Sequence, residues 1–151
     1  MVSLIGYTKC KLDEKSRLVL PSRFLKQLDG DDAMEFVLKP NPDKPCLDLY
    51  PKSQWGIISS KLAQLDEFQP EVQDFLIHFL RGHQAVSTDK ANRISIDPQL
   101  RNEISMGRDV TLVAILNMIQ IWDTEAYENF TANKPRNFHE ITKQALKNKK
   151  E

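Results

Sequence analysis

The sequence contains one short pattern twice, and this duplication limits the folds open to the chain more than any other feature. Residues 12–21 read LDEKSRLVLP and residues 88–98 read TDKANRISIDP. Each copy holds an Asp, three further residues, an Arg, an alternating apolar stretch and a Pro. The two Asp residues and the two Arg residues align at one offset of 76 positions. A repeat in register predicts two copies of one structural unit.

The similarity continues beyond the pattern with a slowly falling offset. FVL at 36–38 resembles VTL at 110–112 at an offset of 74, and CLDLYPKSQW at 46–55 aligns with MIQIWDTEAY at 118–127 at an offset of 72. The falling offset means that the second half has fewer residues in the connections between its elements. The first half has the longer connection, KPNPDKP. Insertions in surface loops are well tolerated, so the pattern is physically reasonable.

Each half predicts the same series of elements. A strand precedes the Asp, and a short strand follows the Arg. A helix of about two turns comes next, entered at Pro21 in the first half and capped by Asp97 before Pro98 in the second, with Gly30 and Gly107 closing these helices. Two more strands with apolar alternation and an amphipathic helix complete each half. The predicted strands are 4–12, 17–20, 35–40 and 46–51, then 83–88, 93–96, 109–116 and 118–123, and the closing helices are 52–65 and 124–131.

One predicted helix links the halves. It opens at Pro70 and ends at Gly82, and it has an apolar stripe at helical spacing, for which we expect packing against the sheets. The stripe consists of Val72, Phe75, Leu76, Phe79 and Leu80. Matching aromatic positions, Tyr50 with Trp122 and Trp55 with Tyr127, predict packing in the core or at a subunit interface.

A unit of about 45 residues is near the lower size limit for folding alone, so the two units should share a core. We therefore expect a mainly β fold with short helices (α+β), in which the halves interlock as one pseudo-twofold β-barrel. The chain of 151 residues predicts a single domain of this kind.

Composition restricts the partners. The chain has 21 Lys and Arg against 21 Asp and Glu, so it does not bind nucleic acid through bulk charge, although local basic spots stay open. No apolar run is long enough to span a bilayer, and no signal peptide is visible, so we expect a cytoplasmic protein.

Cys10 and Cys46 show no disulfide or zinc spacing and predict free thiols in or beside strands. Residues 134–151 are basic and predict a frayed tail, with a binding role as the alternative.

Catalytic motifs are missing from the sequence. His78 and His83 lie five residues apart on a predicted helix, which is not the spacing of a zinc pair, and there is no Gly-rich phosphate loop, G-x-S-x-G or H-E-x-x-H. Carboxylates at exposed turns beside Arg stay ionised and are poor general acids. We expect no enzyme, no cofactor, no metal site and no small-molecule substrate.

The pattern D-x-K-S-R-L-V-L-P, the strands ending L-Y-P-x-x-x-W and the second D-x-x-x-R copy ending I-W-D resemble the MraZ family, over about residues 3–130. The resemblance implies two AbrB-type swapped-hairpin repeats per chain that form a double-split barrel. It places the first repeat at 4–54, connecting helices at 55–82, the second repeat at 83–126 and a C-terminal helix with basic tail at 127–151. It also implies a bacterial transcriptional regulator of the division and cell-wall gene cluster, acting in the cytoplasm and on the nucleoid.

The resemblance further implies a ring-shaped homo-oligomer whose D-x-x-x-R loops bind repeated promoter boxes and repress its own operon. The residue before each Arg is often Gly in the family, but here it is Ser16 and Asn92. Because Asn tolerates a left-handed turn better than Ser does, we expect the two turns to differ in shape.

The residue types fit such a contact physically. A β-ribbon tip can enter a major groove, where Arg17 and Arg93 can donate two hydrogen bonds to guanine. Lys15 and Lys90 suit phosphate contacts, and Asn92 can bond to adenine or shape the turn. Asp13, Ser16 and Asp89 are expected to structure the loops. For the carboxylates this means accepting bonds from turn N–H groups or pairing with the Arg.

Two other interpretations stay open. The Asp and Arg of each copy can form a turn ion pair with no ligand. Alternatively, the protein is an oligomeric interaction scaffold with no specific DNA readout, and its partner binding should then be insensitive to salt.

Overall fold

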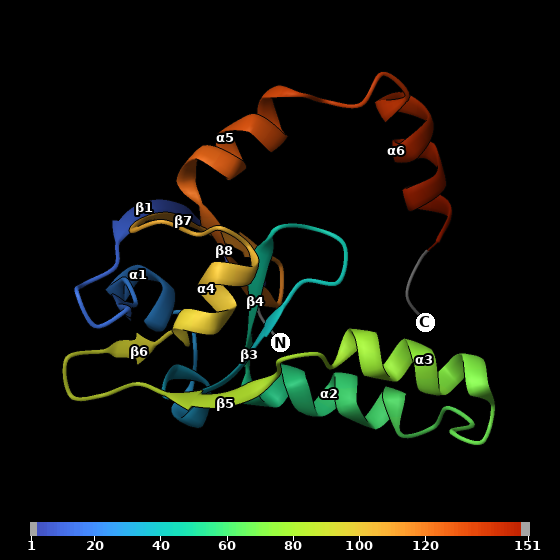
Figure 1. Ribbon diagram of the computed structural model, residues 1–151, viewed down its shortest axis with the longest axis horizontal. Helices are drawn as coiled ribbons and strands as arrows, with labels where there is room; N and C mark the ends of the chain where they lie inside the picture. The colour runs from blue at the N-terminus through green and yellow to red at the C-terminus, as the bar shows by residue number, and fades with distance from the viewer. Residues whose placement is uncertain (1–2, 149–151) are drawn as a thin grey trace.

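The computed structural model describes residues 3–148, which form a mixed α+β fold with a mostly antiparallel sheet and short helices (Figure 1). The first half contains β1 Tyr7–Lys11, β2 Arg17–Val19, α1 Ser22–Leu25, the 3-10 helix η1 Gly30–Ala33, β3 Glu35–Pro40, β4 Cys46–Pro51 and α2 Lys52–Leu62. The second half contains α3 Pro70–Phe79, β5 Gln84–Ser87, β6 Arg93–Ser95, α4 Pro98–Glu103, β7 Asp109–Ile115, β8 Met118–Asp123, α5 Thr124–Ala132 and α6 Phe138–Lys147. Lys149 and Lys150 of the predicted basic tail lie outside the described residues.

The main sheet has six strands in the order β1-β7-β8-β4-β3-β5, and β2 pairs with β6 in a separate two-stranded ribbon. β1 and β5 are both edge strands, so the sheet is open and the expected closed barrel is not formed. The physical reason lies in β2 and β6, which have three residues each and pair with one another instead of joining the two edges.

Each half contributes its first strand to the other half. β1 pairs with β7 and β5 pairs with β3, so neither strand lies beside the strands of its own repeat in the main sheet. The registers are equivalent, because Lys11 lies opposite Asp109 just as Ser87 lies opposite Glu35. The equivalent residues Asp48 and Gln120 lie opposite one another where β4 and β8 meet. A pseudo-twofold axis therefore passes between β4 and β8.

The core lies between this sheet and the small ribbon, and both repeats contribute to it. Its members are apolar and almost fully buried, as expected for alternating strands with one face toward the interior. They include Leu12, Leu18, Leu20, Phe24, Phe36, Leu38, Leu47, Leu49, Ile94, Ile96, Leu100, Val110, Leu112, Ile119 and Ile121. A shared core of this kind means that neither half is a complete folding unit.

A buried ion pair lies beside the pseudo-twofold axis. The Lys39 Nζ is 3.6 Å from the Asp48 carboxylate, and both side chains are inaccessible to solvent. Burial lowers the pKa of Lys39 and raises the pKa of Asp48. Amides of Asn41 and Gln120 donate to Asp48, and the Lys39 ammonium also lies 4.3 Å from the ring centre of Phe79. These contacts compensate for the loss of hydration.

The matched aromatic positions make equivalent contacts within the two halves. Tyr50 contacts Trp55 with ring centres 5.5 Å apart, and Trp122 contacts Tyr127 at 5.7 Å. Cys10 and Cys46 are free thiols in β1 and β4, as predicted. Burial raises the pKa of the Cys46 thiol to about 12, so this thiol stays protonated at neutral pH.

Several predicted helix ends are wrong. α1 has one turn and ends at Leu25, so Gly30 does not close it but begins η1. α4 ends at Glu103, and the left-handed residue after it is Ser105, not Gly107. α2 ends at Leu62. The predicted cap on α4 is confirmed, since the Asp97 side chain accepts a hydrogen bond from the Gln99 N–H.

The linking helix also differs from the prediction. α3 ends at Phe79, before Gly82, and His83 lies after it. None of its residues is fully buried, and Phe75 is 48% exposed, so the apolar stripe does not pack against the sheets as expected. The end of α3 approaches the sheet, where the ring centre of Phe79 lies 4.3 Å from the Lys39 Nζ. α6 likewise lies apart from the sheet with no buried residue (Figure 1).

Candidate functional site

The first Asp–Arg turn connects β1 to β2. The Asp13 Oδ1 accepts hydrogen bonds from the backbone N–H groups of Lys15 and Arg17, both at 2.9 Å. The Asp13 Oδ2 accepts a third from the Arg17 Nε at 2.7 Å. Backbone bonds from Asp13 N to Arg17 O and from Ser16 N to Asp13 O complete the turn. One carboxylate therefore shapes the loop and orients the guanidinium.

The second turn connects β5 to β6 and repeats this network bond for bond. The Asp89 Oδ1 accepts from the N–H groups of Ala91 and Arg93 at 2.8 and 2.9 Å, and the Oδ2 accepts from the Arg93 Nε at 2.8 Å. Asp89 N donates to Arg93 O, and Asn92 N donates to Asp89 O. The identical spacing of Asp and Arg is thus required by the geometry of the turn itself.

The electrostatics of the two turns are also equivalent. The backbone N–H of Arg17 and then its side chain hold the pKa of Asp13 below the usual value, despite partial desolvation. Arg93 lowers the pKa of Asp89 in the same order. Both carboxylates are ionised at neutral pH and remain acceptors for the Arg.

The two turns also have the same backbone shape. Ser16 and Asn92 both have φ of 59°, in the left-handed region. The expected difference in shape between the turns is therefore wrong. Ser16 is buried, and its Oγ accepts a hydrogen bond from the Arg101 Nη1 at 2.6 Å, which helps to hold the unfavourable conformation.

The turns lead directly into the β2–β6 ribbon, which places both Arg residues on one surface. Leu18 and Ile94 are opposite one another and point into the core. Side chains alternate along a strand, so Arg17 and Arg93 project from the other face. Arg17 is opposite Ser95, and Arg93 is opposite Val19, so the two Arg residues are diagonal neighbours, roughly 7–8 Å apart at the backbone.

Each Arg keeps donors for a ligand. The Asp carboxylates engage only the Nε atoms. Within residues 3–148, the terminal nitrogens of Arg17 and Arg93 form no hydrogen bond. A guanidinium fixed at Nε with a free terminal fork is suited to a planar acceptor edge or to a phosphate.

The Lys residues of the two turns are exposed but not equivalent. Lys15 aligns with Ala91, and Lys90 aligns with Glu14, so each turn has one Lys at a different place. Both stand at the tips, ahead of the Arg. Asn92 is exposed, and no hydrogen bond of its side chain is found in the described part of the chain.

Sequence reasoning missed Arg101. This residue of α4 connects the second repeat to the first turn through Ser16, and its Nε is buried without a partner among the described residues. The repeat alignment contained a signal for it, because Arg101 aligns with the apolar Leu25. A charged residue at a position that is apolar in the other copy indicates a local role.

Other kinds of site find no support in the described chain. No group of three or more His, Cys, Asp or Glu side chains comes together in residues 3–148 as a metal site would need. None of the helices described is long and apolar enough to cross a membrane.

The fold and the turns define a class of α+β protein with two repeats. The two repeats exchange strands and share one core, and each has an Asp–Arg turn. Comparison with known proteins identifies the family. The family model described as "MraZ protein" matches residues 4–77 and 79–149. The chain belongs to the MraZ family.

Curated relatives cover nearly the whole chain. The "Transcriptional regulator MraZ" of Flavobacterium psychrophilum is 30% identical over 148 residues, which is 98% of this chain and 94% of the relative. The protein of the same name from Christiangramia forsetii is 30% identical over 98% of this chain and 96% of its own length. That from Escherichia fergusonii is 36% identical over 78% of each chain. These names describe a regulator of transcription, which is not an enzyme class.

Proposed function

We propose that this protein is a sequence-specific DNA-binding transcriptional regulator that reads promoter DNA through its two Asp–Arg turns. The observation that carries the proposal is the equivalent fixing of Arg17 and Arg93, each held at Nε by its own Asp with the terminal fork free. A terminal guanidinium fork can donate to the O6 and N7 atoms of guanine in the major groove. The names of the curated relatives agree with a regulator.

Within this function the turn residues have separate roles. Arg17 and Arg93 read bases, Lys15 and Lys90 contact phosphates, and Asn92 contacts a base or shapes its turn. Asp13, Ser16 and Asp89 structure the loops. The exchange of β1 and β5 between repeats supports a swapped-hairpin unit of the AbrB type. In this proposal the repeats span 4–54 and 83–126, the connecting helices 55–82 and the tail 127–151.

The proposal extends to assembly and regulation. The protein forms a ring-shaped homo-oligomer, binds repeated boxes upstream of its own operon in the division and cell-wall cluster, and represses it on the nucleoid in the cytoplasm. A chain with 21 basic and 21 acidic residues gains little from bulk charge. Several weak contacts along repeated boxes would multiply into useful affinity.

The test is DNA binding by fluorescence anisotropy. The probe is the duplex directly upstream of the protein's own gene, with a scrambled duplex of equal composition beside it. Arg17→Ala and Arg93→Ala are compared with Arg136→Ala, which removes the same charge from an exposed position outside the turns. We expect at least one turn variant to lose about 5- to 150-fold of the preference for the promoter duplex, from loss of a contact worth about 1–3 kcal/mol.

Equal binding of both duplexes by the wild type would refute sequence-specific readout. A preference for the promoter duplex that neither Arg17→Ala nor Arg93→Ala lowers more than Arg136→Ala does would also refute the role of the turns.

A second candidate function is the oligomeric protein-interaction scaffold. It is favoured by exposed apolar side chains on the helices outside the sheet, namely Phe75 and Ile77 of α3 and Phe138, Ile141 and Leu146 of α6. Partner binding through such surfaces should persist as salt rises, whereas DNA binding should weaken steeply.

A further inference from the structure

The pseudo-symmetry of the backbone does not extend to the charges beside the two turns. β1 leads into the first turn and β5 into the second, and their residues correspond at the offset of 76. Lys9 and Lys11 of β1 correspond to Ala85 and Ser87 of β5. The strands are equivalent in register but not in charge.

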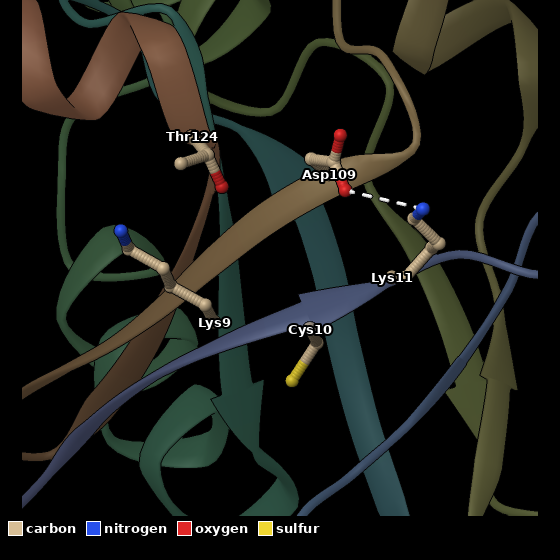
Figure 2. A pocket seen from close by; sticks show the side chains of 5 residues that line it. All are labelled: Lys9, Cys10, Lys11, Asp109 and Thr124. Atoms are coloured by element: carbon tan, nitrogen blue, oxygen red, sulfur yellow. Dashed lines mark ion pairs between the residues drawn. The ribbon is translucent and has the colours of Figure 1, made fainter.

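Lys9 and Lys11 project from one side of β1, while Cys10 projects from the other (Figure 2). They border a shallow pocket of about 430 Å³, which is lined by Lys9, Cys10, Lys11, Asp109 and Thr124. Lys11 is two residues from Asp13, so the pair of lysines lies next to the first turn along the chain, on the face of β1 that points away from the core. Their side chains are 60% and 65% exposed and can reach a ligand in solution.

Both lysines have carboxylate neighbours that a phosphate can replace. The Lys9 Nζ lies 3.2 Å from Glu128, and the Lys11 Nζ lies 3.7 Å from Asp109. Exposed ion pairs of this kind contribute little to stability. Exchange of a carboxylate for a DNA phosphate therefore has a low cost.

Arg108 adds a third cation at the base of the first turn. Its backbone oxygen accepts from Leu12 N at 2.8 Å, and its Nε donates to Leu12 O at 3.1 Å, so it is fixed directly against the end of β1. The equivalent contact beside the second turn is from Thr88 N to Met34 O. A neutral residue thus takes the place of Arg108 there.

The second turn instead has an acidic surrounding. Glu35 of β3 lies opposite Ser87 of β5 and has Lys52 as its counter-ion at 3.0 Å, and Asp31 and Asp32 lie in η1, which leads into β3. The strand–turn–helix segment 9–29 has six basic and three acidic residues, whereas its equivalent 85–105 has three of each. The first turn is therefore surrounded by excess positive charge and the second is not.

We propose that the two turns contribute unequally to DNA binding: the first is the stronger contact, and Lys9 and Lys11 extend it along the phosphate backbone. This inference rests on the proposed function and adds two phosphate-binding residues to it. At the second turn, nearby carboxylates repel the DNA phosphates and weaken the contact. Each phosphate contact adds about 0.9 to the slope of log affinity against log salt concentration.

The test compares Lys9→Gln/Lys11→Gln with Lys143→Gln/Lys147→Gln, which removes the same charge from α6. Both variants are titrated with the promoter duplex and the scrambled duplex at several salt concentrations. Loss of two phosphate contacts per bound subunit lowers the slope of log affinity against log salt concentration by roughly 2. The ratio of wild-type affinity to variant affinity should therefore fall about 3.5-fold each time the salt concentration doubles. Because phosphates are the same in every sequence, the affinity for the promoter duplex and for the scrambled duplex should fall by the same factor.

A second comparison addresses the inequality of the turns. Arg17→Ala should reduce promoter affinity more than Arg93→Ala does. Neutralisation of the acidic surrounding in Asp31→Asn/Glu35→Gln should increase the affinity, and more so at low salt.

The outcomes separate this inference from the proposed function. Suppose that the wild type prefers the promoter duplex, but Lys9→Gln/Lys11→Gln leaves the salt slope unchanged or Lys143→Gln/Lys147→Gln lowers it equally. The proposed phosphate contact of Lys9 and Lys11 is then overturned, while the proposed DNA-binding function stands. Equal losses in Arg17→Ala and Arg93→Ala would overturn the inequality. A wild type without preference for the promoter duplex overturns both proposals. Melting temperatures of all variants establish that each is folded.

Discussion

Ser16 has a backbone conformation that costs a residue other than glycine about 1–2 kcal/mol. Asn92 has the same φ in the second turn, but only Ser16 receives a hydrogen bond from the part-buried Arg101. The two positions thus form a natural comparison, in which the backbone conformation is the same and the side-chain contacts differ.

Ser16→Ala should lower the free energy of unfolding by about 1.5–3 kcal/mol, because it removes the acceptor of a charged hydrogen bond and leaves Arg101 unpaired. Asn92→Ala is the matched control, with an expected loss of about 1 kcal/mol or less. Chemical denaturation of both variants measures the difference. Equal destabilisation would show that the bond from Arg101 contributes nothing.

The turn carboxylates predict a response to acid. The pKa values of Asp13 and Asp89 are lower in the folded protein than in the unfolded chain, where they are near 3.8. Their contribution to stability is therefore complete above the unfolded value and is lost as the pH falls through the folded value. The stability difference between wild type and Asp13→Asn/Asp89→Asn should be constant near neutral pH and vanish once the pH has fallen below the folded pKa values of the two carboxylates. Thermal unfolding at a series of pH values tests this, and a difference that persists in acid would contradict it.

Residues that act within one turn could be predicted from sequence, and residues that act between repeats could not. Asp13 and Arg17 are four positions apart, so their geometry follows from the local chain. Arg101 reaches Ser16 across 85 residues, and that contact depends on the exchange of strands. Lys9 and Lys11 were not predicted as site residues, because their neighbours Glu128 and Asp109 come from the second repeat and depend on the pairing of β1 with β7.

At the scale of elements, the connection between α3 and β5 depends on Gly82. Its φ is 70°, and a Cβ there would lie 3.0 Å from the Leu100 Cδ2 and 3.2 Å from the Pro40 Cδ. Gly56 is the opposite case, since it lies inside α2 with nothing within 4 Å of a Cβ.

Gly82→Ala should lower the free energy of unfolding by about 2–4 kcal/mol, from left-handed strain together with overpacking. Gly56→Ala should raise it by roughly 0.5–1 kcal/mol through helix propensity. Thermal unfolding of the two variants provides the comparison. A stable Gly82→Ala protein would mean that the approach of this segment to Pro40 and Leu100 is not required.

The accuracy of the sequence prediction differs between strands and helices for a physical reason. β3, β4 and β8 have the predicted bounds, because apolar alternation continues to the ends of a half-buried strand. The short helices were predicted too long, because Gly30 and Gly107 were taken as caps although the chain leaves the helix earlier. The amphipathic stripe of α3 predicted burial, but periodicity does not specify what covers a face.

At the scale of the whole molecule, the exchange of strands makes the two halves dependent on each other. In residues 1–82 alone, β1 lacks β7, β2 lacks β6 and β4 lacks β8, and only the β3–β4 pair remains. The core residues of the first half would then be exposed on one side. A single hairpin is at best marginally stable in water.

The isolated fragment 1–82 should therefore show no cooperative thermal transition as a monomer, and addition of fragment 83–151 should restore one. Circular dichroism with size-exclusion chromatography measures both properties. A folded homodimer of 1–82 would agree with the same principle, because a second copy can supply the pseudo-equivalent strands in the registers of β7, β6 and β8. A cooperatively folded monomer would contradict it, since that fragment would have to bury Leu12, Leu18 and Leu49 without any strand of the second repeat.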